Sequence, residues 1–295
     1  MNIDYYRIFL KVAETHSLTA TAEQIGYTQS GVSHIVSQLE LEFGFPLIMR
    51  NKSGAAITQN GEQLLPLIRD IVNRDEQLHQ AAADIKGIRA GRLSVGAFTS
   101  VAIHWLPKII KEFNILYPNI EFDIVIGDYK HLEDMISREE VDCGFTTGTM
   151  CKNMDFTPLK QDRLLALLPI SHPLANGDSL PIEAIKDIDL IIPGEGYGYD
   201  IGRILKQAGI KPNIKYSVSD DYVAISMVEN GLGITIMPEL IVTGSHGKVA
   251  ILELEPKHSR TIGIATRLNV NTSPACKAFL EFVRLWVNAR LPYES

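Results

Sequence analysis

The stretch Ser17–Arg50, SLTATAEQIGYTQSGVSHIVSQLELEFGFPLIMR, contains two helical patterns separated by a tight turn. The first pattern ends at Gly26, a residue that accepts the positive φ common at helix C-termini. Thr28 then offers a hydroxyl that can cap a second helix running to Phe43. On that helix, apolar residues three and four positions apart form one narrow stripe, which indicates a buried side. The stripe consists of Val32, Val36, Leu39 and Phe43.

The opposite side of the second helix carries small, uncharged, hydrogen-bonding side chains instead of the Lys and Glu of an ordinary solvated face. Such side chains can bond to the base edges and phosphates of DNA. Two short helices around a tight turn, with such a face on the second, predict a helix-turn-helix motif. An αα-hairpin with a Ser-rich solvated face is the alternative. The predicted DNA-contacting residues of this segment are Thr28, Gln29, Ser30, Ser33, His34 and Ser37.

Residues 45–58, FPLIMRNKSGAAIT, contain two short apolar runs around a turn. This pattern predicts a β-hairpin, or wing, with Arg50 and Lys52 at its tip, where they can reach backbone phosphates. The module formed by residues 1–58 is not basic, because four cations stand against five acids and give a net charge of −1. The cations are Arg7, Lys11, Arg50 and Lys52, and the acids are Asp4, Glu14, Glu23, Glu40 and Glu42.

Residues 59–90 predict a long helix that connects two domains and ends in a hinge. Its apolar residues follow a heptad spacing over about three repeats, interrupted at Asp75. Pro66 is expected to bend the first turns, and Gly87 and Gly91 indicate the hinge. We expect this helix to dimerise the protein; a helix laid along its own domain is the alternative. The predicted contact residues are Leu64, Ile68, Ile71, Leu78 and Ile85.

From residue 91 onward, short apolar strands alternate with helical patterns, which indicates an α/β domain with a largely parallel sheet. The order of these patterns predicts two similar lobes joined by two crossing strands, with a cleft between the lobes. The first lobe is expected at about 91–162 and 266–295, and the second at about 163–265.

The ends of the predicted strands in this domain suggest a binding site for a small ligand. Thr99-Ser100 follows the strand LSVGAF, where backbone N–H groups and hydroxyls converge, and ligands of open sheets bind at the carboxyl ends of strands. The glycine-rich loop 194–198, GEGYG, faces this edge from the second lobe. Each of these positions could instead be a plain cap or turn. The predicted ligand contacts are Thr99, Ser100, Thr146, Thr147, Gly194 and Tyr197, and they favour an anionic or polyhydroxylated molecule, although a cationic one stays open.

In these motifs the chain resembles the LysR-type transcriptional regulators. The matches in the first domain are Ser17-Leu18-Thr19, Ala22-Glu23, Thr28-Gln29-Ser30, Val32-Ser33, Gln38-Leu39-Glu40, Phe43-Gly44, Pro46-Leu47, Arg50, Thr58 and Gly61. Looser matches in the second are Trp105-Leu106-Pro107, Val141-Asp142, His172-Pro173-Leu174-Ala175 and Gly231-Leu232-Gly233-Ile234. The resemblance implies a mostly α winged helix-turn-helix, a long linker helix, and a two-lobed α/β effector domain similar to type II periplasmic solute-binding proteins.

The resemblance also implies a cytoplasmic homodimer or homotetramer. Such a protein would bind two-fold related half-sites on double-stranded DNA, respond to a small-molecule effector and contact RNA polymerase. Two features depart from the family: His34 stands where Arg or Lys is common, and the module is not basic. The weak positive charge predicts low non-specific DNA affinity, so useful binding should need two or more modules on one site.

Composition and motifs disfavour several other classes of protein. A net charge of −7 argues against coating nucleic acid or membrane by charge alone, and no apolar run reaches the roughly 18–20 residues of a membrane span. The chain has no phosphate-loop, dinucleotide, nucleophile-elbow or zinc-protease motif, so we expect no enzyme, no metal and no cofactor. Two alternatives remain. One is a solute-binding protein, disfavoured by the DNA module and the lack of a signal-peptide pattern, and the other is a redox sensor that uses Cys143 and Cys151.

Overall fold

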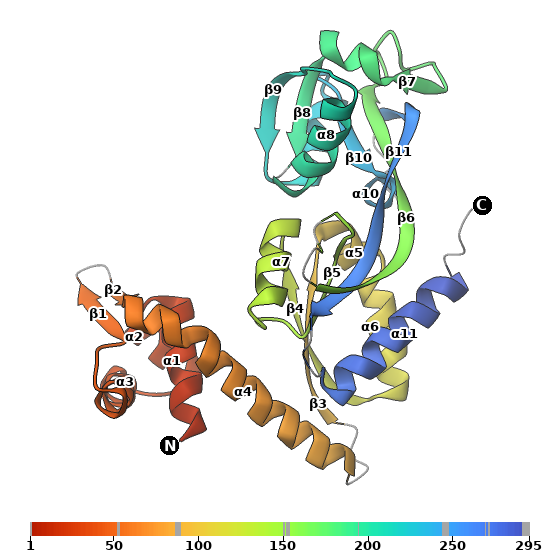
Figure 1. Cartoon of the computed structure of the whole chain (residues 1–295). Helices are drawn as coiled ribbons and strands as arrows, with labels where there is room; N and C mark the ends of the chain where they lie inside the picture. The colour runs from red at the N-terminus through yellow and green to blue at the C-terminus, as the bar shows by residue number, and fades with distance from the viewer. Residues whose placement is uncertain are drawn as a thin grey trace. The chain divides into compact units, whose positions relative to one another are not determined.

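Figure 1 shows a computed structural model of the chain, which describes residues 2–51, 54–85, 90–149, 151, 154–193, 195–243, 248–268, 270 and 272–290. The chain divides into two compact units, Met1–Ile88 and Arg89–Ser295, called the first and second domains below. Within the described ranges, no helix is both long and apolar enough to cross a membrane.

The first domain is a winged helix-turn-helix with a long helix attached, as the sequence predicts. Its elements are α1 (Ile3–Thr15), α2 (Leu18–Ile25), α3 (Gln29–Phe43), β1 (Ile48–Asn51), β2 (Gly54–Ile57) and α4 (Gln59–Ile85). Ser17 and Thr28 cap α2 and α3 by accepting bonds from backbone N–H groups three residues further on. Gly26 ends α2 in the left-handed conformation, with φ 72°. Local capping therefore sets both helix boundaries of the motif.

The core of the first domain joins all its elements. The stripe predicted for α3 is buried at Val32, Val36 and Leu39, while Phe43 is partly buried against the same core. α4 lies on α1 and contributes Ile68 and Val72 to this core. Pro66 lies inside α4, which continues through it as one helix. The first turns of α4 are thus held by packing on their own domain.

The wing is anchored to the end of α1. The β1–β2 hairpin pairs Ile48 with Ile57 and Asn51 with Gly54. The N–H of Ala55 donates to the carbonyl oxygen of His16 at 2.8 Å. Gly54 has a φ of 134°, and a Cβ there would stand 2.5 Å from that same oxygen. Only glycine allows the hairpin to approach α1 this closely.

The first lobe of the second domain is built on three parallel strands with helices packed on them. β3 (Ala90–Ala97) pairs in parallel with both β4 and β5, so their carboxyl ends lie at one edge. The other elements of this lobe are α5 (Thr99–His104), α6 (Leu106–Leu116), β4 (Asn119–Ile126), α7 (Tyr129–Ser137), β5 (Cys143–Thr147) and α11 (Pro274–Arg290). The C-terminal helix α11 packs on this lobe, where it contacts α6 and β3.

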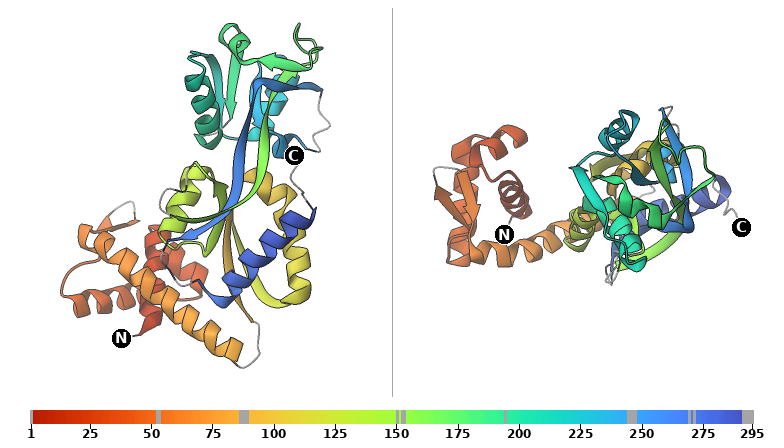
Figure 2. Two further views of the ribbon diagram at one scale, coloured as in Figure 1. Left: turned by 45° about the vertical axis from the view of Figure 1, so that its right-hand side comes forward. Right: turned by 90° about the horizontal axis from the view of Figure 1, so that it is seen from above.

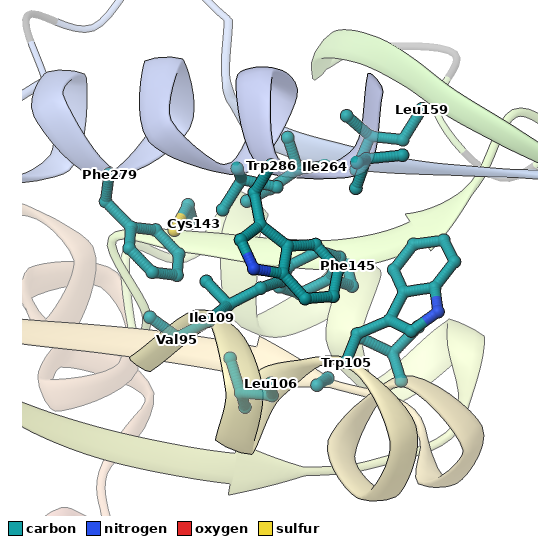
Figure 3. Packing of buried hydrophobic residues seen from close by; sticks show 14 of the residues in the cluster. Val95, Trp105, Leu106, Ile109, Cys143, Phe145, Leu159, Ile264, Phe279 and Trp286 are labelled. Atoms are coloured by element: carbon teal, nitrogen blue, oxygen red, sulfur yellow. The ribbon is translucent and has the colours of Figure 1, made fainter. Parts of the chain in front are cut away.

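The core of the first lobe is rich in aromatic side chains. Figure 3 shows Phe279 and Trp286 of α11 pointing toward sheet residues such as Val95 and Phe145, and all four are buried in one cluster. The indole N–H of Trp286 donates to Glu112 at 3.1 Å, so its polar end is satisfied at the rim of the cluster. This packing fixes the strand ends from which the candidate ligand residues project.

Two long crossing strands connect the lobes, as Figures 1 and 2 show. β6 (Met154–Pro169) and β11 (Val249–Arg267) pair antiparallel from one lobe into the other. The pairing is interrupted between Glu253 and His258 and again between Ile262 and Gly263. Each strand is one element that serves both lobes, so the border between the lobes falls inside β6 and β11.

The second lobe repeats the parallel arrangement on a smaller scale. β8 (Asp189–Pro193) pairs in parallel with β9 (Asn213–Val218), and β10 (Thr235–Pro238) pairs antiparallel with β6. The other elements of this lobe are β7 (Ser179–Pro181), a short 3-10 helix (Ile182–Asp187), α8 (Glu195–Gln207), α9 (Asp221–Glu229) and α10 (Glu239–Val242). α8 packs on β8 through Ile201, Ile204 and Leu205, all buried.

Candidate functional site

The N-terminal half of α3 presents a polar surface to solvent. Gln29, Ser30 and His34 are exposed, as a helix that contacts DNA requires. Ser33 and Ser37 are half-buried, and the Ser37 hydroxyl donates to the carbonyl oxygen of Ser33 at 2.9 Å. Of the predicted recognition residues, the first three are therefore the best placed to reach base edges.

Thr28 has a structural role at the start of α3. Its Oγ1 accepts the N–H of Gly31 at 3.1 Å and lies 3.1 Å from the Ser30 hydroxyl. Beside it, Tyr27 is 53% exposed. The sequence analysis did not single out Tyr27, although an aromatic residue directly before a helix N-cap is visible in the sequence.

An acidic residue of the module holds the wing in place. The Glu40 carboxylate accepts the backbone N–H groups of Leu47 and Ile48 at 2.8 and 3.1 Å. Its negative charge is therefore used for a bond between α3 and β1. The side chain of Arg50 and the whole of Lys52 lie outside the described residues, so their contact with phosphates stays a prediction.

The predicted heptad stripe of α4 divides between two faces. Ile68 is 2% exposed and Leu64 packs against the core of its own domain, so Ile68 cannot meet a partner helix. Ile71 and Leu78 are 44% and 67% exposed, and Leu67, which the prediction missed, is 57% exposed. The side chain of Ile85 is not among those described. The face available to a partner is therefore Leu67, Ile71 and Leu78.

In the second domain, the predicted ligand residues lie at the carboxyl ends of β3 and β5. α5 begins at Thr99, which is partly exposed, while Ser100 is buried. Thr146 and Thr147 end β5 and are buried, and hydrogen bonding from Thr146 acts to lower the pKa of the neighbouring Cys151 thiol. The predicted glycine-rich loop 194–198 is wrong for residues 195–198, which form the first turn of α8. Gly194 and the side chain of Tyr197 lie outside the described part of the chain.

Arg260 on β11 is the centre of a buried polar cluster that the sequence reading did not find. Its Nη2 donates to the Ser100 hydroxyl at 2.9 Å, and its Nη1 donates to the Tyr129 hydroxyl on α7. Its guanidinium lies 4.7 Å from the centre of the Phe98 ring. The predicted Ser100 hydroxyl thus already accepts a bond from a cation of this same chain.

Asp162 neutralises Arg260. Its Oδ2 accepts from Arg260 Nε at 2.8 Å and lies 2.6 Å from Nη2. Its Oδ1 accepts the N–H of Leu240, at the start of α10, at 3.0 Å. The two residues of this pair are 98 positions apart in sequence, so no local sequence pattern could predict their contact. One carboxylate thereby ties both crossing strands to α10.

Asp200 brings α8 of the second lobe to the same cluster. The residue is 1% exposed, and its Oδ1 accepts a long bond, 3.4 Å, from Arg203. Burial raises the pKa of Asp200 above its usual range, although the charges of Arg260 and Arg203 and hydrogen bonds from Arg203 and Tyr129 act in the opposite direction. The ionised form of this carboxyl is therefore poorly stabilised.

Asp200→Asn is expected to raise the melting temperature of the second domain above pH 7. An acid whose folded pKa is raised contributes its full stability below the unfolded pKa, roughly 3.9, and loses it as pH rises through the folded pKa. The gain should therefore shrink as pH falls through the folded pKa and vanish below the unfolded pKa, roughly 3.9, where the wild-type carboxyl is protonated in both states. Thermal melts over a pH series test this, with the exposed Asp155→Asn as control. A lower melting temperature at every pH would contradict it.

The surroundings of Cys143 and Cys151 disfavour a reactive redox site. Hydrogen bonding with the neighbouring Cys276, and then burial, raise the pKa of Cys143 well above its usual value. Cys151 bonds to the carbonyl oxygen of Thr147 at 3.3 Å, and burial raises its pKa to about 11. Both thiols are protonated at neutral pH and hence slow to oxidise, which disfavours the Cys143/Cys151 alternative. No cluster of three or more potential metal ligands occurs among the described residues.

Known protein families match both domains of the chain. The family model for a bacterial regulatory helix-turn-helix protein of the lysR family matches residues 3–62, and the LysR substrate binding domain matches residues 86–287. The chain belongs to the LysR family of transcriptional regulators. A LysR relative, the HTH-type transcriptional regulator YvbU of Bacillus subtilis, is 29% identical over 287 residues, which cover 96% of this chain and 98% of the relative.

Solved structures support the LysR fold. The effector binding domain of QuiR in complex with shikimate is 26% identical, has a TM-score of 0.64, and covers 68% of this chain and 99% of that one. A full-length OxyR variant from Pseudomonas aeruginosa is 23% identical, has a TM-score of 0.75, and covers 97% and 95% of the two chains. This LysR-type regulator therefore combines a DNA-binding domain with a two-lobed effector domain.

Proposed function

We propose that this regulator reads DNA through the exposed N-terminal face of α3, placed in the major groove, with the wing on the backbone. The observation that carries the proposal is the exposure of Gln29, Ser30 and His34 on a helix whose start is fixed by the Thr28 cap. In this division, residues 1–58 are the DNA-binding module, 59–90 the linker helix and hinge, and 91–295 the effector-binding domain.

The effector is proposed to bind between the lobes, at the edge formed by Thr99, Ser100, Thr146 and Thr147, with the segment from Gly194 to Tyr197 facing it. The polar cluster around Arg260, which includes the Ser100 hydroxyl, supports this location. The complex of QuiR with shikimate supports a small hydroxylated acid as effector. A ligand that prefers one arrangement of the lobes would shift the population of that arrangement and so control the DNA-binding modules.

The same proposal includes assembly and partners. Leu67, Ile71 and Leu78 give α4 an exposed apolar face that suits a homodimer, and pairs of dimers would form a homotetramer. A dimer fits double-stranded DNA with two-fold related half-sites. Regulators of this family control transcription, so contact with RNA polymerase and a cytoplasmic location are expected. We propose no catalytic activity, because the family consists of regulators and not of enzymes.

His34→Ala is expected to relax the sequence preference of DNA binding. One good base contact contributes about 1–3 kcal/mol of discrimination, so specific affinity should fall by roughly tenfold per half-site while non-specific affinity stays. Lys52→Ala should instead weaken binding to all sequences and reduce the salt dependence by about one unit. Binding-site selection followed by titration at fixed salt measures both.

The matched control for this experiment is His131→Ala, which removes an exposed histidine from α7 in the second domain. It should bind DNA as the wild type does. If His34→Ala and Ser33→Ala both retain the wild-type footprint and sequence preference, α3 is not the recognition helix.

A further inference from the structure

Three buried polar atoms next to the Arg260 cluster have no hydrogen-bond partner among the described atoms. They are Asp200 Oδ2, Arg203 Nε and His258 Nε2. Asp200 and Arg203 lie three residues apart on α8, so they share a face of the helix. His258 stands two residues before Arg260 on β11, so both side chains leave the same face of the strand. The second lobe and a crossing strand thus converge on one place.

The Arg260 guanidinium does not supply the missing partner of these atoms. The Arg260 guanidinium already donates to Asp162, Ser100 and Tyr129. A buried carboxylate oxygen without a donor is rare in folded proteins and needs an explanation, such as a bound group or an ordered water that donates to it. The Arg203 side chain is 38% exposed as a whole, although its Nε is buried.

The combination of an acceptor with a donor selects the chemistry of the bound group. A hydroxyl can donate to Asp200 Oδ2 and accept from Arg203 Nε–H at the same time. A carboxylate has no proton to donate to Asp200 Oδ2, and an ammonium would leave Arg203 Nε unpaired. Burial and the charge of Arg203 lower the pKa of His258, so its imidazole is neutral near pH 7 and can bond to a second hydroxyl.

We propose that Asp200, Arg203 and His258 bind neighbouring hydroxyl groups of a polyhydroxylated effector. This rests on the proposed effector site between the lobes and adds the residues that select the hydroxyl groups of the effector. Asp200 discriminates against ligands without hydroxyls, because their binding would leave its oxygen buried and unpaired. The alternative is that only water satisfies these three buried atoms, and the experiment distinguishes it from effector binding.

The test uses isothermal titration calorimetry on the full-length chain with three probes. Sodium D-gluconate and sodium hexanoate share chain length and charge and differ in their hydroxyl groups, while sorbitol keeps the hydroxyls without the charge. Gluconate should bind saturably and hexanoate should not. Asp200→Leu should weaken gluconate binding by about tenfold to a hundredfold, the value of a hydrogen bond to a charged group. Glu239→Gln removes a partly exposed carboxylate on α10 and should bind as the wild type does.

Arg203→Met is a second variant at a partly exposed position, which guards against a folding defect in Asp200→Leu. Gluconate binding that is unchanged in both variants would place the hydroxyl site elsewhere and overturn the inference. Equal binding of hexanoate and gluconate, lost in Ser100→Ala, would overturn hydroxyl selection while leaving the effector site between the lobes. If neither gluconate nor sorbitol binds the wild type, water fills the place and the inference fails. Site selection on DNA then decides separately whether the proposed regulator function stands.

Discussion

Asp162→Ala is expected to lower the free energy of unfolding of the second domain by about 3–5 kcal/mol, the usual result of removing one partner of a buried ion pair. Asp162 and Arg260 have side chains that are 6% and 1% exposed. Without the carboxylate, the guanidinium stays buried with its positive charge uncompensated. The N–H of Leu240 loses its acceptor as well.

Denaturant unfolding followed by tryptophan fluorescence measures this change without interference from the first domain. The chain has two tryptophans, Trp105 and Trp286, and both lie in the core of the second domain. Asp155→Ala, at an exposed position of the same strand, should change stability by less than about 0.5 kcal/mol. The double variant Asp162→Leu/Arg260→Met should recover most of the loss, because two apolar side chains replace a buried pair well. A loss below about 1 kcal/mol in the single variant would show that the pair is hydrated.

The helix-turn-helix was predictable because its determinants are local. The Ser17 and Thr28 caps, the Gly26 turn and the α3 stripe all act within a few residues of one another. The same holds for the strand ends at Thr99 and Thr147, which the alternation of strands and helices placed at one edge of a sheet.

The Arg260 cluster was not predictable because its members come from distant segments. Ser100, Asp162, Asp200 and Arg260 meet only after β6 and β11 have paired and α8 has packed on the second lobe. In the sequence, Arg260 is one cation in a strand that alternates polar and apolar residues. Period-two alternation identifies a face of a strand, but it does not show that the face is covered.

The sequence predicted that the linker segment is a helix, but not which face of that helix is exposed. Ile68 and Ile71 both fit one heptad pattern, although three residues separate them by about 60° around the helix axis. Packing against α1 takes Ile68 and Val72 into the core and leaves Leu67, Ile71 and Leu78 outside. Spacing alone cannot tell which of two neighbouring apolar stripes belongs to the monomer.

Leu78→Asp is expected to abolish dimerisation and to weaken binding to a two-half-site DNA fragment by roughly 10²–10⁴-fold, which is the loss of linked binding by two modules. Leu78 is 67% exposed in the single chain, so the charge should leave both domains folded. In a dimer seam, an unpaired buried carboxylate costs several kcal/mol. Sedimentation velocity and DNA titration measure the two effects. Leu78→Met keeps an apolar side chain and should behave as the wild type. His79→Asp is the control for charge, because it adds the same charge on a neighbouring face of α4. A Leu78→Asp protein that sediments as a dimer would show that α4 does not form the seam.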